Sequence, residues 1–374
     1  MELQQDLMPS MSITWEGRQG QPQARNGLTA SRGEIETRDD GTQDGETEIY
    51  SVPEDIMCHI HSLMPMRDAA RAACVSHAFL CAWRCRPHLI FNNKTFGLTQ
   101  NACGKDEISR DFYSNIDQIL KKHSGVGIKT LKLQISSDYI VSYSYLDSWL
   151  QTAVTPGIEE LELTLSSMKG AKYNLPYSLF ANGSGESIRY LRLVGCSFRP
   201  KVALGWLKFR SLRKLHLCAV GIRGDELGRM LSNSFALEKL KLAYCDEIVC
   251  LKIPCLLQRL SRLKVFGCSR LTVVENEAPY LSSFFFQADF TLQISLGETL
   301  RMKSLEMFGR GAIYYTRAQL SASMPNLETL TICSSGEAGE LPIILIRREP
   351  DGLKVHSFTS LGASWALPHH KSIS

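Results

Sequence analysis

The sequence contains no apolar run of about 20 residues, the length that an α-helix needs to cross a bilayer. The longest candidate, Leu341–Ile346, is far shorter. The first residues, MELQQDL, lack the basic segment and following apolar segment of a secretory signal. The net charge of +4 is too small to indicate a nucleic-acid partner. We therefore expect neither a membrane nor a nucleic acid as a partner.

Catalytic signatures are also absent, since none of GxxxxGKS/T, GxGxxG, HExxH and GxSxG occurs. Twelve cysteines in a chain without a visible signal indicate reduced thiols. A zinc site could be drawn from Cys58, His59, His61, Cys81 and Cys85, but no spacing among them makes four ligands converge. We favour the interpretation that these cysteines are small core or surface residues. We expect no catalytic residue, no metal and no cofactor, and a cytoplasmic or nuclear location.

Aromatic residues are scarce in the first 49 positions, where Trp15 stands alone among Gln, Gly, Glu, Asp, Arg and Thr. Such a segment cannot bury enough apolar surface to offset the entropy of ordering, so we predict that it is disordered. The chain as a whole is 44% hydrophobic and 21% charged. That balance is typical of a globular protein, and the length allows one small module and one long one.

Residues 51–86 have the pattern of three short amphipathic helices. Ile56, Ile60 and Leu63 fall at i, i+4 and i+7, which is one face of a helix. The alanine-rich residues 67–74 favour a second helix and residues 75–86 a third. So short a segment buries too little surface to fold well alone, and its apolar content predicts that a partner completes its core.

Two apolar residues separated by one recur nine times after residue 128, with first members 21 to 30 residues apart. The doublets are Leu131/Leu133, Leu161/Leu163, Leu191/Leu193, Leu215/Leu217, Leu240/Leu242, Leu263/Val265, Phe284/Phe286, Leu305/Met307 and Leu330/Ile332. Alternation with period two predicts short strands with one buried side. This spacing resembles that of leucine-rich repeats, whose stacking buries a continuous core.

Three cysteines support this register, because Cys196, Cys245 and Cys268 each lie five residues after the first member of a doublet. In leucine-rich repeats this position holds Asn or Cys, whose small buried side chain satisfies the backbone of a turn. Beyond the ninth doublet, Leu353/Val355 could form a tenth, degenerate strand.

The segment Val52-Pro53-Glu54-Asp55-Ile56 begins a series of matches that resembles an F-box in the form common in plants. The later matches are Ile60 with Leu63, Arg67-Asp68-Ala69, Cys74-Val75-Ser76 and Trp83. Val52 departs from the family, which usually has Leu there. The resemblance implies a helical module that docks on the Skp-type adaptor of a cullin ubiquitin ligase. The cysteine form of the repeats also resembles that of F-box proteins.

The predicted fold is therefore α/β, a small three-helix F-box followed by a leucine-rich-repeat solenoid with a curved parallel sheet. The predicted parts are a disordered segment 1–49, an F-box 50–95, a linking helical region 96–127 with an amphipathic helix over 108–122, leucine-rich repeats 128–345 and a degenerate repeat or tail 346–374.

The function that this resemblance implies is substrate recognition in an SCF-type ubiquitin ligase, without catalysis by the chain itself. The residues expected to contact the adaptor, or to frame the contact, are Val52, Pro53, Ile56, Ile60, Leu63, Val75 and Trp83. Some of them are expected in the interior, because sequence does not separate the two faces of so small a module. The alternatives are a repeat scaffold for regulatory binding outside a ligase and, more weakly, a receptor for a small molecule or inositol phosphate.

The outward positions of the strands predict where a protein target binds, because they lie beside and between the inward doublets. Six Lys or Arg residues fall on the third to sixth predicted strands, with aromatic residues among them. The predicted target-binding residues are Tyr190, Arg192, Lys214, Lys239, Lys241, Arg262, Lys264, Phe266 and Phe285. They would receive an acidic or phosphorylated segment, with Tyr190, Phe266 and Phe285 as apolar anchors. The alternative, which we favour slightly, is that these charges only keep an exposed sheet soluble.

Overall fold

The structure is a computed structural model. It describes residues 52–96, 105–124, 127–136, 142–166, 172–199, 208–288, 293–297, 300–312, 324–333, 342–349 and 352–359. For residues 105–109, 342–349 and 352–359 only the backbone is described. The segment predicted to be disordered, residues 1–49, lies outside the described residues.

Three short helices begin the described chain: α1 (Glu54–Leu63), α2 (Met66–Val75) and α3 (His77–Arg84). Met64 is extended before Pro65, as expected for a residue that precedes proline, and it separates α1 from α2. Ser76 separates α2 from α3, where its Oγ accepts the Phe79 N–H at 3.5 Å as an N-cap. The three predicted helices are thus present.

A strand that the doublet pattern did not find, β1 (His88–Phe91), follows α3 within the range predicted for the F-box. Leu89 and Phe91 are buried, and β1 pairs in parallel with the first repeat strand. Two helices, α4 (Asn93–Phe96) and α5 (Lys105–Lys122), lie between β1 and the repeats. The second of them contains the amphipathic helix predicted over 108–122.

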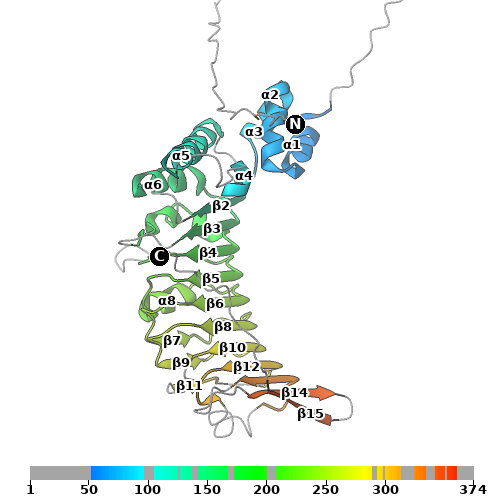
Figure 1. The fold of residues 1–374 in the computed structure, drawn as a ribbon, viewed down its shortest axis with the longest axis vertical. Helices are drawn as coiled ribbons and strands as arrows, with labels where there is room; N and C mark the ends of the chain where they lie inside the picture. The colour runs from blue at the N-terminus through cyan, green and yellow to red at the C-terminus, as the bar shows by residue number, and fades with distance from the viewer. Residues whose placement is uncertain are drawn as a thin grey trace, which may run out of the picture. The chain divides into compact units, whose positions relative to one another are not determined.

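All nine doublets lie on strands of one sheet, which has 12 strands within the described residues. The repeat strands are β2 (Thr130–Ile135), β3 (Glu160–Leu165), β4 (Tyr190–Val194), β5 (Lys214–Cys218), β6 (Lys239–Ala243), β8 (Arg262–Phe266), β10 (Ser283–Gln287), β12 (Ser304–Phe308) and β13 (Thr329–Cys333). They pair in parallel with the doublets aligned, so that Leu131 stands beside Leu161 and Leu161 beside Leu191 (Figure 1). The repeat prediction is confirmed.

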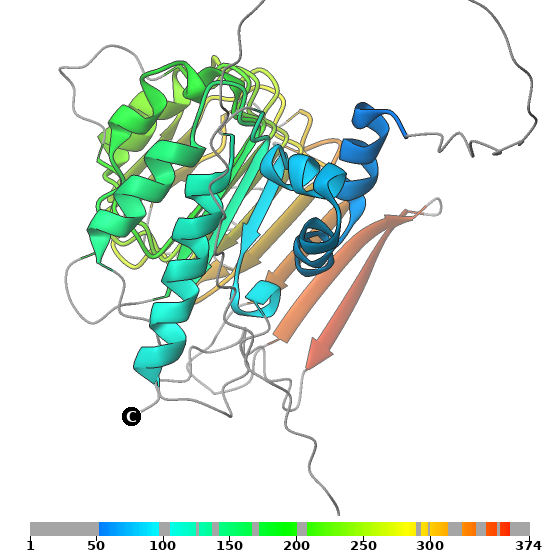
Figure 2. The ribbon, with the colours of Figure 1, turned by 90° about the horizontal axis from the view of Figure 1, so that it is seen from above.

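The connecting segments cover one face of this sheet and leave the other open (Figure 2). They carry α6 (Tyr143–Ala153), the 3-10 helix η1 (Tyr177–Phe180), α7 (Ser184–Ser187), α8 (Gly224–Leu231) and a second sheet of β7 (Cys250–Ile253), β9 (Val273–Asn276) and β11 (Gln293–Ser295). The doublets meet buried connector residues such as Trp149, Leu231 and Leu257 in one continuous core. Burial of the inward side chains fixes which strand face remains outside.

The buried cysteines occupy the turns as predicted. Cys196, Cys245 and Cys268 are all buried. The Cys245 thiol donates to the carbonyl oxygens of Ala243 at 3.4 Å and Leu217 at 3.8 Å, and the Cys268 thiol donates to the Phe266 carbonyl at 3.7 Å. These thiols therefore find acceptors in the turn backbone, where the Ala243 and Phe266 carbonyls also accept the N–H groups of Ala219 and Tyr244.

The sheet ends in an antiparallel pair, β14 (Pro342–Glu349) and β15 (Gly352–Thr359), rather than in a tenth repeat. Leu353 and Val355 lie on β15, which is separated from β13 by β14. The segment between β13 and β14 is too short for the crossover of a dozen or more residues that a parallel strand requires. The strand that follows β13 therefore pairs with it in antiparallel.

Candidate functional site

The apolar face of α1 points away from the protein. His61 is the one buried residue of this helix, whereas Ile56, Ile60 and Leu63, the α1 stripe, are between 43% and 72% exposed. An amphipathic helix normally turns its apolar face to the core. Val52 and Val75 are exposed as well. The module thus presents an uncovered apolar surface of the kind that marks an interaction site.

The inner side of α1 is filled by His61 instead. Its Nε2 lies 3.2 Å from the Ala69 carbonyl oxygen, and its ring packs against those of Phe79 and Trp83. Burial lowers the pKa of His61, so the ring stays neutral at pH 7. Trp83 is half-buried behind the α1 stripe and packs on the main core, whereas Pro53 is exposed at the start of α1.

Arg86 fastens this module to the repeats. Its guanidinium is buried and donates to the carbonyl oxygens of His61 at 2.7 Å and Met64 at 2.6 Å at the end of α1, where the His61 carbonyl also accepts the Met64 N–H at 3.2 Å. Its Nε donates to the His88 carbonyl on β1 at 3.2 Å. His123, after α5, lies with Nε2 2.8 Å from the Arg86 carbonyl oxygen. One side chain thereby links α1 to the edge of the sheet.

The exposed sheet face brings the predicted cations together in two rows, because adjacent strands align them. The first row is Tyr190, Lys214, Lys239 and Arg262, and the second row is Arg192, His216, Lys241 and Lys264. Phe285 follows Lys264 in the second row, and Phe266 lies beside Ala243 one step further along the strands. All nine predicted target-binding residues therefore lie on this face.

Arg192 is the one member of these rows that has an anionic partner among the described residues. Its Nε lies 3.1 Å from Glu162 Oε1, and its Nη1 lies 2.9 Å from His216 Nδ1. Burial, then Lys241 and Arg192, lower the pKa of His216 to about 4. His216 is therefore neutral at pH 7 and accepts the Arg192 N–H.

The other five cations, Lys214, Lys239, Lys241, Arg262 and Lys264, form no ion pair within the part of the chain that the structure describes. Burial lowers the pKa of Lys241, and so do Arg192 and Lys264. The residues just before the strands are different, because there Lys129 and Arg189 both pair with Glu159, and Arg213 pairs with Glu238. The two rows thus present uncompensated positive charge.

An aromatic cluster adjoins the cations and consists of Tyr244, Phe266, Phe285 and Phe308. The ring centroids lie 5.7 Å apart for Tyr244 and Phe266, 6.1 Å for Phe266 and Phe285, and 5.3 Å for Phe285 and Phe308. Lys241 Nζ lies 5.2 Å from the Phe266 centroid, and Lys264 Nζ lies 5.3 Å from that of Phe285. The cations and the rings therefore form one surface.

Sequence reasoning did not place Tyr244 at this surface, because it lies in the turn after β6 rather than at an outward strand position. The available signal was its position four residues after Leu240, where other repeats hold Gly195 and Gly267. Phe308, at the end of β12, is an outward strand position that was not among the predicted target-binding residues.

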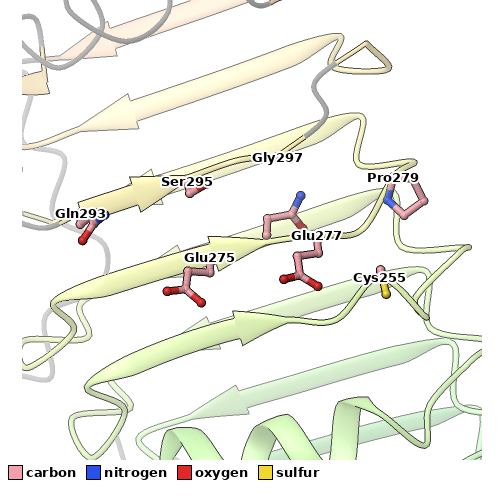
Figure 3. A pocket seen from close by; sticks show the side chains of 8 residues that line it. Cys255, Glu275, Glu277, Pro279, Gln293, Ser295 and Gly297 are labelled. Atoms are coloured by element: carbon pink, nitrogen blue, oxygen red, sulfur yellow. The ribbon is translucent and has the colours of Figure 1, made fainter.

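A hollow of about 600 Å³ lies on the second sheet, at β9 and β11 (Figure 3). Glu275, Glu277, Gln293 and Ser295 line it. Glu275 pairs with Lys252 at 2.9 Å, and no three His, Cys, Asp or Glu side chains of the described segments converge as metal ligands there or elsewhere. No helix among the described residues has the length and apolarity to cross a bilayer. The hollow thus carries two carboxylates, of which Glu275 is already paired, whereas the sheet face carries five cations without ion pairs among the described residues.

Known proteins resemble this chain, and a known family matches its repeats. A family profile described as "At1g61320/AtMIF1, LRR domain" matches residues 119–348. "F-box protein At5g03100" of Arabidopsis thaliana is 27% identical over 233 residues, which is 62% of this chain and 67% of that protein. From the same plant, "F-box/LRR-repeat protein At5g02910" is 24% identical over 222 residues, 59% of this chain and 44% of that protein. "F-box/FBD/LRR-repeat protein At3g51530" is 26% identical over 189 residues, 50% of this chain but only 36% of that protein.

Proposed function

This chain belongs to the plant family of F-box proteins with leucine-rich repeats, and from that premise we propose that it is the substrate-recognition subunit of an SCF-type E3 ubiquitin ligase. The α1 stripe is the observation that supports the proposal most directly. A helix that turns Ile56, Ile60 and Leu63 outward and a histidine inward lacks a cover for its apolar face. A Skp-type adaptor, and through it a cullin, would supply that cover in the cytosol or nucleus.

The proposed mechanism is positional. The helical module holds the adaptor, the repeats hold the target, and a ubiquitin-charged enzyme elsewhere in the complex meets a lysine of that target. Such proximity raises the rate without a catalytic group in this chain. The link from Arg86 to α1 and β1 suits this role, because it fixes the helices to the first strand of the sheet.

The target side of the proposal rests on the open sheet face. The five cations without ion pairs favour a target that is acidic or phosphorylated, since a positive surface attracts such a segment and fixes its register. Tyr190, Phe266 and Phe285 supply apolar contacts beside them. The identity of the target is a matter for purification with and without a proteasome inhibitor, followed by mass spectrometry.

The adaptor contact is tested by Ile56→Asp, with Ile56→Leu as the matched control. A carboxylate buried at an interface without a partner costs several kcal/mol (about 3 or more). We therefore expect adaptor binding to fall by about 100-fold or more, while Ile56→Leu binds as the parent does. Titration of purified adaptor measures both, and urea unfolding checks that the fold is intact. Unchanged binding of Ile56→Asp would refute the assignment.

A repeat scaffold outside any ligase is the second candidate. The observation in its favour is that the family profile covers residues 119–348 and leaves α1–α3 outside the match. Co-purification that recovers a target but neither adaptor nor cullin would support this candidate over the first.

A further inference from the structure

We propose that the open sheet face binds one extended acidic segment of a protein, in which carboxylates lie on the two cationic rows and an adjoining apolar side chain docks on the aromatic cluster. This inference rests on the proposed function, since it names the class of target that the repeats would hold. It adds that the acidic part and the apolar part of the target lie next to each other, and that Tyr244 receives the apolar group.

This arrangement follows from the layout of the strands. The cations occupy β4, β5, β6 and β8, whereas the rings occupy β8, β10 and β12 and the turn after β6. Neighbouring strands lie about 4.8 Å apart, so an extended chain crossing them passes one strand every one to two residues. A segment that crosses from β4 toward β12 therefore meets positive charge first and aromatic rings second.

Carboxylates fit the cations better than a single phosphate does. A phosphate is best held by a guanidinium fork, and only Arg262 of the first row offers one without an ion pair among the described residues, because Arg192 of the second row is already paired with Glu162. The unpaired cations of that row are Lys241 and Lys264, on neighbouring strands rather than around one point. Lysine is a point charge, so such a row suits several single charges spaced along a segment.

The conformation and exposure of Tyr244 favour a binding role for the aromatic cluster. The Tyr244 φ of +53° is left-handed, a conformation that is rare for a bulky residue. The same position of other repeats also has a positive φ, and there it holds the small residues Gly195, Ala219 and Gly267. Gly267 also leaves room for the ring, because a Cβ there would lie 2.5 Å from Tyr244 Cδ1. The ring is nevertheless 46% exposed. A strained aromatic that stays half in solvent gains little from the fold, which points to a binding role.

The test is selection of random 12-residue peptides displayed on phage, using the full chain bound to its adaptor. We expect enrichment of Asp and Glu on one side of an aromatic or aliphatic residue. A synthetic peptide of the enriched sequence, followed by fluorescence anisotropy, should bind at least about 10-fold more weakly to Lys241→Glu/Lys264→Glu. Arg210→Glu, an exposed cation before β5, is the control for a charge change elsewhere and should leave binding unchanged.

Tyr244→Gly isolates the apolar end. It should weaken the enriched peptide by about 10-fold, and this loss should vanish when the apolar residue of the peptide is replaced by Gly. The inference would be overturned if no peptide were selected or if the selected peptides were not acidic. It would also be overturned if binding survived charge reversal or required phosphoserine. Adaptor binding is measured on the same variants. Its retention in the sheet-face variants separates failure of this inference from failure of the proposed function, which Ile56→Asp tests.

Discussion

The helical module turns aliphatic side chains outward, whereas the repeats turn theirs into the core. Ile60 on α1 is 43% exposed, whereas Leu240 on β6 is 1% exposed. Each repeat strand has a connector behind it and a strand on either side, so its inward residues are covered. The helices α1–α3 have too little surface of their own to cover the α1 stripe. Burial is therefore decided by what lies opposite a residue, and an uncovered apolar face in a short module indicates a partner.

The largest effect that tests this contrast is expected at two neighbours on β10. Phe284 is fully buried, and Phe285 lies on the open face. Phe284→Ala should lower the free energy of unfolding by about 3–5 kcal/mol, because a large cavity is left in the core. Phe285→Ala should lower it by only about 1 kcal/mol, the value of its ring contacts.

Urea unfolding of the two variants measures the difference. Equal losses would mean that the two faces of the sheet are not as different as their burial indicates. Phe285→Ala should also weaken the acidic peptide, which Phe284→Ala affects only through unfolding.

A smaller effect is expected where the two regions meet. Arg86→Met keeps much of the side-chain length but removes the donors to the carbonyl oxygens of His61, Met64 and His88. Removal of these three hydrogen bonds from a buried charged donor makes us expect a loss of about 3 kcal/mol, although the His61 carbonyl keeps the Met64 N–H. Arg84→Met is the control, since this exposed neighbour makes no side-chain hydrogen bond in the described residues and should change stability by less than about 0.5 kcal/mol.

Hydrogen exchange locates the effect of Arg86→Met. Amides of α1 should exchange faster in that variant, while those of β5 and β6, far along the sheet, should keep their protection. Uniform loss of protection would mean that the helices and the repeats unfold as one unit.

The repeats could be predicted in detail because each doublet specifies its own register. A slip by one residue would turn Leu240 and Leu242 outward, so period two leaves little choice. The first strand, β1, was missed because the doublet Leu89/Phe91 lies 42 residues before Leu131, outside the repeat spacing. The antiparallel end was missed because Leu353/Val355 matches the spacing of a repeat, and only pairing reveals that β14 intervenes.

The site could be predicted in part for a similar reason. Alternation along a strand assigns Lys241 and Lys264 to the open face, but it does not reveal which cations have anionic partners. Pairing of Arg192 with Glu162 depends on the strand register, and so does the neutral state of His216. The F-box resemblance put Trp83 among the residues expected to contact the adaptor or to frame the contact, and its packing against His61 places it behind the α1 stripe.

The smallest expected effect concerns the backbone at Tyr244. In most positions Gly is less stable than Ala by roughly 0.5–1 kcal/mol, because Gly loses more chain entropy on folding. At a φ of +53° the order should reverse, since a Cβ costs about 1–2 kcal/mol in the left-handed region. Tyr244→Gly should therefore be about 1 kcal/mol more stable than Tyr244→Ala in urea unfolding, although both variants lose the ring that packs on Phe266. Greater stability of Tyr244→Ala would mean that the backbone at residue 244 is not strained. The conformation of Tyr244 would then no longer favour a binding role for its ring.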